Sequence, residues 1–431
     1  MAEKVKVGII GFGTVGAGVA NTLLKNGDII ASRTGVTVEL TRIADLDITT
    51  DRGVDVPASL LTTDADKLID EVDVVVELIG GKTVARKMIL KAIAKGKHVV
   101  TANKALLAEF GGEIFEAAAK NGVDVWYEAS VGGGIPVIKA LREGLAANRI
   151  ERIYGILNGT CNYILTRMEA EGADFAPILA DAQKLGYAEQ EPSLDVDGFD
   201  TAHKATILAA LAYGEWFGME PIHVEGIRDV SQLDLAYADE LGYRIKLLAI
   251  IKQINGDVQL RVHPTLIPKS ALLGNISGVF NGVSITGDTV GDTLFYGRGA
   301  GRSATASAVV ADIVDVARNI VSGSVGRVPA FRAGRQYHAL CPMSEIVSRY
   351  YLRLAVRDES GVLAAITNVL SHYDISLSSV VQRETVSPDG SVPLLILTHA
   401  TKEAGIEQAI RDIEKLPSVI GSVKRFRIED I

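Results

Sequence analysis

Hydrophobic and polar positions alternate with two different periods along the first 130 residues. Short apolar runs of the kind that form buried strands occur at residues 4–10, 36–44, 73–79, 98–101 and 123–128. Helical spacing of apolar residues is found between them, at 17–25, 84–95 and 109–121. Strands that alternate with helices in this way predict a doubly wound parallel sheet of the Rossmann type over residues 1–130.

The pattern changes after the glycine cluster at 132–134. It predicts helices at 175–185, 201–216 and 237–250 and strands at 259–263 and 278–287. We interpret residues 131–321 as an α+β domain for catalysis and dimerisation, whose last helix, 304–320, returns to the first domain. Residues 322–348, rich in glycine, proline and arginine, are interpreted as a linker.

The last stretch, residues 349–431, has a rhythm of its own. Strands are expected at 351–357, 376–384, 393–400 and 423–428, and helices at 362–373 and 402–416. This βαββαβ order predicts a separate ferredoxin-like domain. The whole chain is therefore expected to be α/β with three domains.

Composition narrows the function classes. The formal charge of −9 and the absence of a basic stripe argue against nucleic-acid binding. No apolar run approaches the roughly 18 residues that span a bilayer, so no membrane association is expected. Two distant cysteines, Cys161 and Cys341, cannot form a disulfide framework, which suits a reducing cytoplasm.

The first predicted strand runs directly into the sequence Gly11-Phe12-Gly13-Thr14-Val15-Gly16. In this context Gly11 allows a tight turn, Gly13 lets the backbone approach a pyrophosphate, and Gly16 permits close packing of helix on strand. The diphosphate would lie on the N-terminus of the following helix, whose free N–H groups favour anions. The motif predicts NAD or NADP binding.

Further positions are predicted near the cofactor from the strands that they follow. Asp45 ends the second strand, where an acid usually holds the adenine ribose and repels a 2′-phosphate. Arg42 and Arg52 are close enough in sequence to offset that charge, so the choice between NAD and NADP stays open. Thr101 and Lys104 follow the fourth strand, at the sheet edge where ligands bind.

The segment from Asp195 to Lys204 carries the most chemistry. Asp200 and Lys204 are four residues apart, so on a helix they share a face, and a lysine beside carboxylates can exchange a proton with a substrate hydroxyl. The plain alternative is a solvated, salt-bridged start of a helix. The dinucleotide motif at the N-terminus favours the functional interpretation.

Several segments together resemble the bacterial homoserine dehydrogenases that have a C-terminal ACT domain. They are TANKALL at 101–107, EASVGGGIP at 128–136, NGTCNYI at 158–164, the glycine loop, and the stretch 182–204 with its spaced Asp195, Gly198, Asp200 and Lys204. The resemblance runs from end to end. Glu191 departs from the family, which more often has Asp, Asn or Ser there, and Ala44 stands where many members carry an arginine.

The resemblance implies the reversible interconversion of L-homoserine and L-aspartate 4-semialdehyde with NAD or NADP, on the route to threonine, methionine and isoleucine. It implies that Lys204 is the acid/base and that Lys104 assists it. Glu189 and Asp195 match substrate-binding positions and suit the substrate ammonium, and Gly301 matches a cofactor position. A homodimer or homotetramer is expected.

Two further ligands are implied in the same way. Glu128 with the main-chain carbonyls of Val131, Gly133 and Ile135 matches a monovalent-cation site, for which hard oxygen ligands suit Na⁺. Asp358, Gly361 and Val362 lie in a turn that resembles the ligand turn of ACT domains, which implies feedback inhibition by L-threonine. A purely dimerising ACT domain is the alternative.

Two other functions compete with this one. An aspartate-semialdehyde dehydrogenase would use the same aldehyde, but it needs an activated cysteine nucleophile, and neither cysteine has an obvious histidine nearby. A sensor of NAD and amino acids that is not an enzyme would not need Lys204, Glu189 and Asp195 together.

Overall fold

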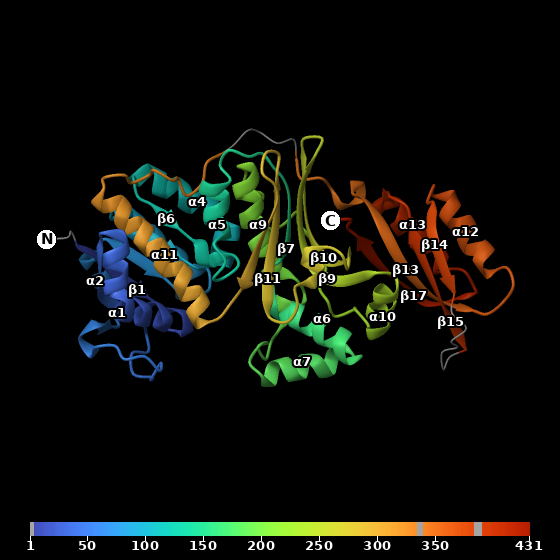
Figure 1. The fold of residues 1–431 in the computed structure, drawn as a ribbon, viewed down its shortest axis with the longest axis horizontal. Helices are drawn as coiled ribbons and strands as arrows, with labels where there is room; N and C mark the ends of the chain where they lie inside the picture. The colour runs from blue at the N-terminus through green and yellow to red at the C-terminus, as the bar shows by residue number, and fades with distance from the viewer. Residues whose placement is uncertain (1–3, 334–338, 383–389) are drawn as a thin grey trace.

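The chain forms three parts in a row, from the N-terminal sheet through a central part to the C-terminal sheet (Figure 1). The computed structural model describes residues 4–333, 339–382 and 390–431. The α/β fold class predicted above is confirmed.

The N-terminal part is built on a six-stranded sheet in which all neighbouring strands are parallel, in the order β3-β2-β1-β4-β5-β6. This is the strand order of a Rossmann sheet. Its strands are β1 (Lys4–Ile10), β2 (Thr37–Ala44), β3 (Leu61–Thr62), β4 (Val74–Glu77), β5 (His98–Thr101) and β6 (Val125–Trp126).

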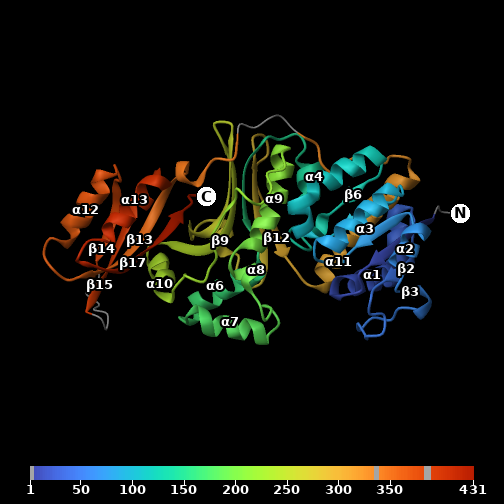
Figure 2. The same cartoon turned by 180° about the vertical axis from the view of Figure 1, so that it is seen from behind.

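Helices cover both faces of this sheet (Figures 1 and 2). One face is covered by α1 (Thr14–Thr34) together with α11 (Arg302–Val321), which comes back from the far end of the central part. Ala306, Val309 and Ile313 of α11 are fully buried in one core with Val7 and Ile9 of β1. The other face carries α2 (Ala65–Glu71), α3 (Thr83–Ala94) and α4 (Lys104–Asn121).

The central part joins helices to a long antiparallel sheet. Its strands follow the order β12-β11-β7-β9-β10, and β8 pairs with β10. The strands are β7 (Ile150–Ile156), β8 (His223–Val224), β9 (Tyr243–Ile254), β10 (Asp257–Pro268), β11 (Phe280–Gly287) and β12 (Gly291–Arg298). The helices are α5 (Val137–Lys139), α6 (Gly159–Glu171), α7 (Phe175–Lys184), α8 (Ser193–Val196), α9 (Phe199–Tyr213) and α10 (Gln232–Glu240).

The helix predicted over 237–250 is wrong. The chain instead ends α10 at Glu240, turns at Gly242 with φ +83°, and enters β9. Residues 245–251 of β9 are buried on both faces, so the strand has no polar side and its sequence is a continuous apolar run. Periodicity alone does not separate such a run from a buried helix.

The C-terminal part has the ferredoxin-like strand order β17-β13-β15-β14. Its elements are β13 (Val347–Arg357), α12 (Val362–His372), β14 (Leu377–Gln382), β15 (Ser391–Thr398), the two-residue β16 (Thr401–Lys402), α13 (Glu403–Ile413) and β17 (Val419–Ile428). Residues 383 and 384 of the strand predicted at 376–384 lie outside the described residues.

The C-terminal sheet continues the central sheet. Strand β17 pairs in parallel with β10, through Thr265 with Arg427 and Leu266 with Ile428, which makes one sheet of eleven strands. The C-terminal and central parts therefore share backbone hydrogen bonds.

The predicted linker packs closely on the central and N-terminal parts. The Arg142 guanidinium donates to the carbonyls of Val328 and Pro329, each at 3.0 Å, and the Phe331 ring stacks on Phe115. Residues 334–338 of this predicted linker lie outside the described residues.

Candidate active site

The glycine loop between β1 and α1 leaves room for a phosphate group. At Gly13 an added Cβ would meet nothing within 4 Å, whereas at Gly16 it would lie 2.0 Å from the carbonyl oxygen of Gly11. Gly11 itself has φ +105°. No side chain caps the N-terminus of α1, so its first N–H groups are available to an anion. The loop fits the pyrophosphate of a dinucleotide.

Asp45 lies beside this loop at the end of β2. Its Oδ2 accepts a hydrogen bond from the backbone N–H of Phe12 at 2.5 Å, and its Oδ1 accepts one from the N–H of Asp47 at 3.0 Å. The carboxylate is therefore fixed at the edge where the adenine ribose is expected. Arg42 is turned away, toward Glu71, and Arg52 pairs with Asp47.

Thr101 lies beneath the cleft. It is fully buried, its hydroxyl donates to Glu77 at 2.7 Å, and it does not itself line the cleft. The neighbouring Ala102, with Val15 of α1 and Gly301 at the start of α11, lines a cleft of about 560 Å³ between the N-terminal and central parts. This volume suits a small-molecule site.

Two lysines and one aspartate meet in this cleft. Asp200 Oδ2 lies 2.6 Å from Lys204 Nζ, and Asp200 Oδ1 lies 2.8 Å from Lys104 Nζ. Lys204 and Asp200 come from consecutive turns of α9, and Lys104 is the first residue of α4. Lys204 also donates to the carbonyl oxygen of Leu157 at 2.6 Å. Each amine is thus held in one place by a shared carboxylate.

Burial and the shared carboxylate act differently on the two amines. Burial lowers the pKa of Lys204, and the opposing charge of Asp200 does not fully offset that effect. For Lys104, burial also lowers the pKa, but the charge and hydrogen bond of Asp200 outweigh it and leave the pKa raised. Burial would raise the pKa of Asp200, yet the two lysines hold it well below its usual range. Lys204 is consequently the amine better matched to proton exchange.

The sequence predicts that residues 158–162 line the cleft, and Asn158 does line it. Its contact with two carboxylates of the site was not predicted. Its Nδ2 donates to Asp195 Oδ1 at 2.7 Å and to Asp200 Oδ2 at 2.8 Å. Its Oδ1 accepts from the backbone N–H of Cys161 at 2.8 Å, which caps α6. The sequence indicates only a helix N-cap at Asn158, which does not reveal that its amide also bridges Asp195 and Asp200.

The two predicted substrate carboxylates occupy different positions. Asp195 lines the cleft and is half-buried, and burial together with the charge of Asp200 raises its pKa. Glu189 is exposed and is not among the residues that line the cleft, but its charge acts on Lys104. Thr160 also lines the cleft, and its hydroxyl donates to the carbonyl of Tyr187 at 2.7 Å. These residues surround the amines with acceptors.

The loop predicted to bind Na⁺ lies next to the cleft. The two carboxylate oxygens of Glu128 accept the N–H groups of Ile138 at 2.9 Å and Lys139 at 2.7 Å, and burial raises the pKa of Glu128 to about 7. The carbonyl oxygen of Ile135 accepts from Val137 N–H at 2.8 Å. Carboxylate and carbonyl oxygens are the type of ligand atom that a hard monovalent cation prefers.

The predicted regulatory turn borders a cavity of about 370 Å³. It lies between β13 and α12, and Asp358, Gly361 and Val362 line it. Gly361, with φ +91°, precedes α12. The cavity is large enough for an amino acid.

Within the described residues, no cluster of three or more histidine, cysteine, aspartate or glutamate side chains is arranged to hold a metal ion. The described helices include none with the length and apolar character that a membrane crossing requires.

The Rossmann sheet, the open glycine loop and the paired amines at the cleft define the class of protein: an oxidoreductase that uses a nicotinamide dinucleotide. Comparison with known families makes this specific. Residues 11–128 match the NAD-binding domain of homoserine dehydrogenase, residues 136–314 match homoserine dehydrogenase, and residues 350–418 match the ACT domain.

Two of the relatives compared match over the whole chain. The homoserine dehydrogenase of Pseudomonas aeruginosa is 48% identical over 434 residues, which cover 100% of both chains. The crystal structure of a homoserine dehydrogenase from Thiobacillus denitrificans has a TM-score of 0.94 at 47% identity and covers 100% of this chain and 99% of its own. A hyperthermophilic archaeal homoserine dehydrogenase in complex with NADPH has a TM-score of 0.60 at 28% identity, over 73% of this chain and 98% of its own.

The chain belongs to the homoserine dehydrogenase family, with an NAD-binding, a catalytic and an ACT domain. It is an oxidoreductase, as the resemblance implied.

Proposed function

We propose that the chain catalyses the reversible interconversion of L-homoserine and L-aspartate 4-semialdehyde with NAD or NADP. The observation that carries the proposal is the single carboxylate of Asp200 holding Lys204 and Lys104 at the cleft, at 2.6 and 2.8 Å. The cofactor would be held by the glycine loop, Asp45, the main chain of Thr101 and Gly301. When bound, the nicotinamide supplies or takes up the hydride.

Lys204 moves the proton. In reduction its ammonium donates a proton to the aldehyde oxygen, and in oxidation its free amine accepts one from the hydroxyl. A pKa lowered by burial brings the free amine within reach of working pH. Lys104, whose pKa is raised, stays charged and polarises the same oxygen.

Asp195 and Glu189 bind the substrate ammonium. Asp195 lines the cleft and Glu189 is exposed near it, and both offer a negative charge to that ammonium. Asn158 keeps Asp195 and Asp200 in fixed orientation by donating to both.

The main competing activity, an aspartate-semialdehyde dehydrogenase, lacks support from the cysteines. The Cys161 thiol is fully buried and donates to the carbonyl of Asp195 at 3.2 Å, and burial raises its pKa well above the usual value. Burial also raises the pKa of the Cys341 thiol. A nucleophilic cysteine needs the opposite shift.

L-Threonine is the proposed inhibitor, bound at the turn of Asp358, Gly361 and Val362. The cavity beside this turn and the continuous sheet through β17 and β10 support the assignment, because they give a ligand site and a path of hydrogen-bonded strands to the central part. Na⁺ is proposed at Glu128 and the carbonyls of Val131, Gly133 and Ile135. Replacing NaCl by choline chloride at constant ionic strength, with wild type and Glu128→Gln, tests that site.

The decisive assay is formation of NADH or NADPH that depends on L-homoserine. The proposal expects turnover with homoserine and none that depends on phosphate. An absence of homoserine-dependent turnover with both cofactors would favour the sensor; phosphate-dependent oxidation of the semialdehyde would favour the competing dehydrogenase.

A further inference from the structure

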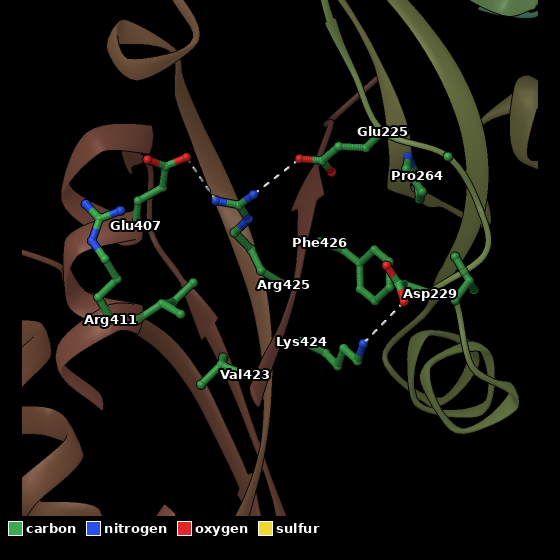
Figure 3. A pocket seen from close by; sticks show the side chains of 12 residues that line it. Glu225, Asp229, Pro264, Glu407, Arg411, Val423, Lys424, Arg425 and Phe426 are labelled. Carbon is green, nitrogen blue, oxygen red and sulfur yellow. Dashed lines mark hydrogen bonds and ion pairs between the residues drawn. The ribbon is translucent and has the colours of Figure 1, made fainter. Parts of the chain in front are cut away.

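A second cleft, of about 580 Å³, lies between the central part and the C-terminal part, on the far side of the central part from the N-terminal sheet (Figures 1 and 3). One wall is the loop of residues 225–230, which we call the seam loop, with Pro264 of β10. The other wall is formed by α13 and β17, through Glu407, Ile410, Arg411 and residues 423–426.

The base of this cleft is apolar. Val230 is 2% exposed and Phe426 6%, and both belong to one apolar core that borders the cleft, whereas Val423, 9% exposed, packs in the separate core of the C-terminal part. Ligand pockets are lined mainly by apolar side chains, so this base suits a ligand that carries a small hydrocarbon group.

Opposite charges lie above this apolar base. Lys424 Nζ and Asp229 Oδ1 face one another at 3.8 Å, too long for a direct hydrogen bond, and the Asp229 side chain is 93% exposed (Figure 3). Arg425 is different, because it is already bound to Glu403 at 2.7 Å and to Glu225 at 3.2 Å. Lys424 and Asp229 can therefore each accept a charged ligand group, whereas Arg425 already has two ion-pair partners.

We propose that the seam cleft binds an α-amino acid as its zwitterion. The carboxylate pairs with the Lys424 ammonium, the amino group pairs with the Asp229 carboxylate, and the side chain lies against Val230 and Phe426. Charge-assisted hydrogen bonds at both ends of one small molecule replace a long, solvated ion pair. A molecule that carries only one of the two charges leaves the other group without a partner.

The seam loop connects this cleft to the active site. The Ile227 N–H donates to the Val196 carbonyl at 2.8 Å, and Arg228 forms an ion pair with Asp197. At Gly226 an added Cβ would lie 2.2 Å from the Val196 oxygen, so the two loops are in direct contact. Val196 directly follows Asp195, and Gly198 precedes α9 with its Asp200 and Lys204.

An amino acid in the seam cleft therefore touches the C-terminal part and the loop that supports the catalytic carboxylates. Its binding stands independently of the activity, whereas any effect on turnover rests on the proposed function. This site is separate from the turn at Asp358, which lies between β13 and α12.

The test is calorimetric titration of the full-length chain with each of the twenty standard L-amino acids, and with acetate and ethylamine as fragments of single charge. Lys424→Ala and Asp229→Asn remove one charge each. Lys415→Ala removes an exposed ammonium of the same domain, paired with Asp412 at 2.7 Å, and is the matched control. Asp358→Ala separates the two sites.

We expect at least one amino acid to bind with a dissociation constant that Lys424→Ala and Asp229→Asn each raise tenfold or more. Lys415→Ala and Asp358→Ala should leave that constant unchanged, and neither fragment should bind comparably. The proposal is overturned if no amino acid binds, if all binding disappears in Asp358→Ala alone, or if Lys424→Ala and Asp229→Asn bind like wild type. If no amino acid binds in this way while homoserine turnover is normal, the amino-acid site in the seam cleft is rejected and the proposed function is unaffected.

Discussion

Lys204 and Asp200 form a buried ion pair along one face of α9, with 2.6 Å between Nζ and Oδ2. Lys204 is 7% exposed and Asp200 2%. Breaking a buried pair by removing one partner leaves the other charge uncompensated, so each residue sets the protonation of the other. The pair links the packing of the helix to the chemistry proposed for the cleft.

The first prediction concerns the pH dependence of Asp200→Asn. Oxidation of homoserine needs the free amine of Lys204, so its rate rises with pH through the Lys204 pKa, and reduction falls through the same value. Burial lowers that pKa and the Asp200 charge raises it. Removing the carboxylate should therefore move both profiles to lower pH, measured as kcat/KM in both directions.

Asp197→Asn is the matched control for Asp200→Asn. It lies in the turn between α8 and α9, just before Asp200, but pairs with Arg228 at 2.5 Å, outside the cleft lining. Its profiles should keep the wild-type midpoint. A midpoint that moves upward in Asp200→Asn would contradict the assignment of the profile to Lys204.

The second prediction separates substrate binding from catalysis. Glu189→Ala should raise KM for homoserine about tenfold, because one of two carboxylates near the substrate ammonium is lost, with kcat little changed. Glu191→Ala, an exposed acid of the same loop that accepts a hydrogen bond from Ser193, should behave like wild type. Steady-state kinetics decide; an unchanged KM with a lower kcat would remove Glu189 from this role.

The third prediction concerns the cofactor. Asp45→Asn keeps an acceptor for the Phe12 N–H but removes the negative charge beside the adenine ribose. A unit charge near a protein surface is worth about 1 kcal/mol or more, so the ratio of kcat/KM for NADP to that for NAD should rise at least about fivefold. Asp51→Asn, in an exposed part of the following loop, is the control. An unchanged ratio would mean that Asp45 does not face the 2′ position.

The fourth prediction concerns inhibition by L-threonine. Asp358→Ala should raise the threonine concentration needed for half inhibition at least tenfold and leave turnover without threonine unchanged. A point substitution is the cleaner test, because deleting the C-terminal part would expose the edge of β10 that pairs with β17. Equal threonine titrations of wild type and Asp358→Ala would reject the site.

Sequence patterns predicted the N-terminal part well because its strands and helices each have a distinct period. Five of the six strands were predicted and the two-residue β3 was not, and the glycine loop is open at Gly13 as its spacing required. Where a strand is buried on both faces, as in β9, the period disappears and the predicted helix was wrong. Strand β12, exposed along one edge, was not predicted at all.

The site was predictable only in part. Asp200 and Lys204 are four residues apart on one helix, so their pairing can be predicted from the sequence, and the structure shows the ion pair. The contact of Lys104 with the same carboxylate is not local, since it joins α4 to α9 across the cleft. Asn158 shows the limit most clearly, because a helix-capping asparagine carries no sign that its amide also bridges two distant carboxylates.

The most direct measurement of the central claim is homoserine-dependent turnover of Lys204→Ala and of Lys204→Met, which keeps more of the side-chain volume, beside Lys184→Ala as an exposed control. Loss of general acid–base help should lower kcat about 10²–10⁴-fold in both Lys204 variants, with the cofactor dissociation constant unchanged and Lys184→Ala like wild type. Turnover near the wild-type rate in a folded Lys204 variant would contradict the account.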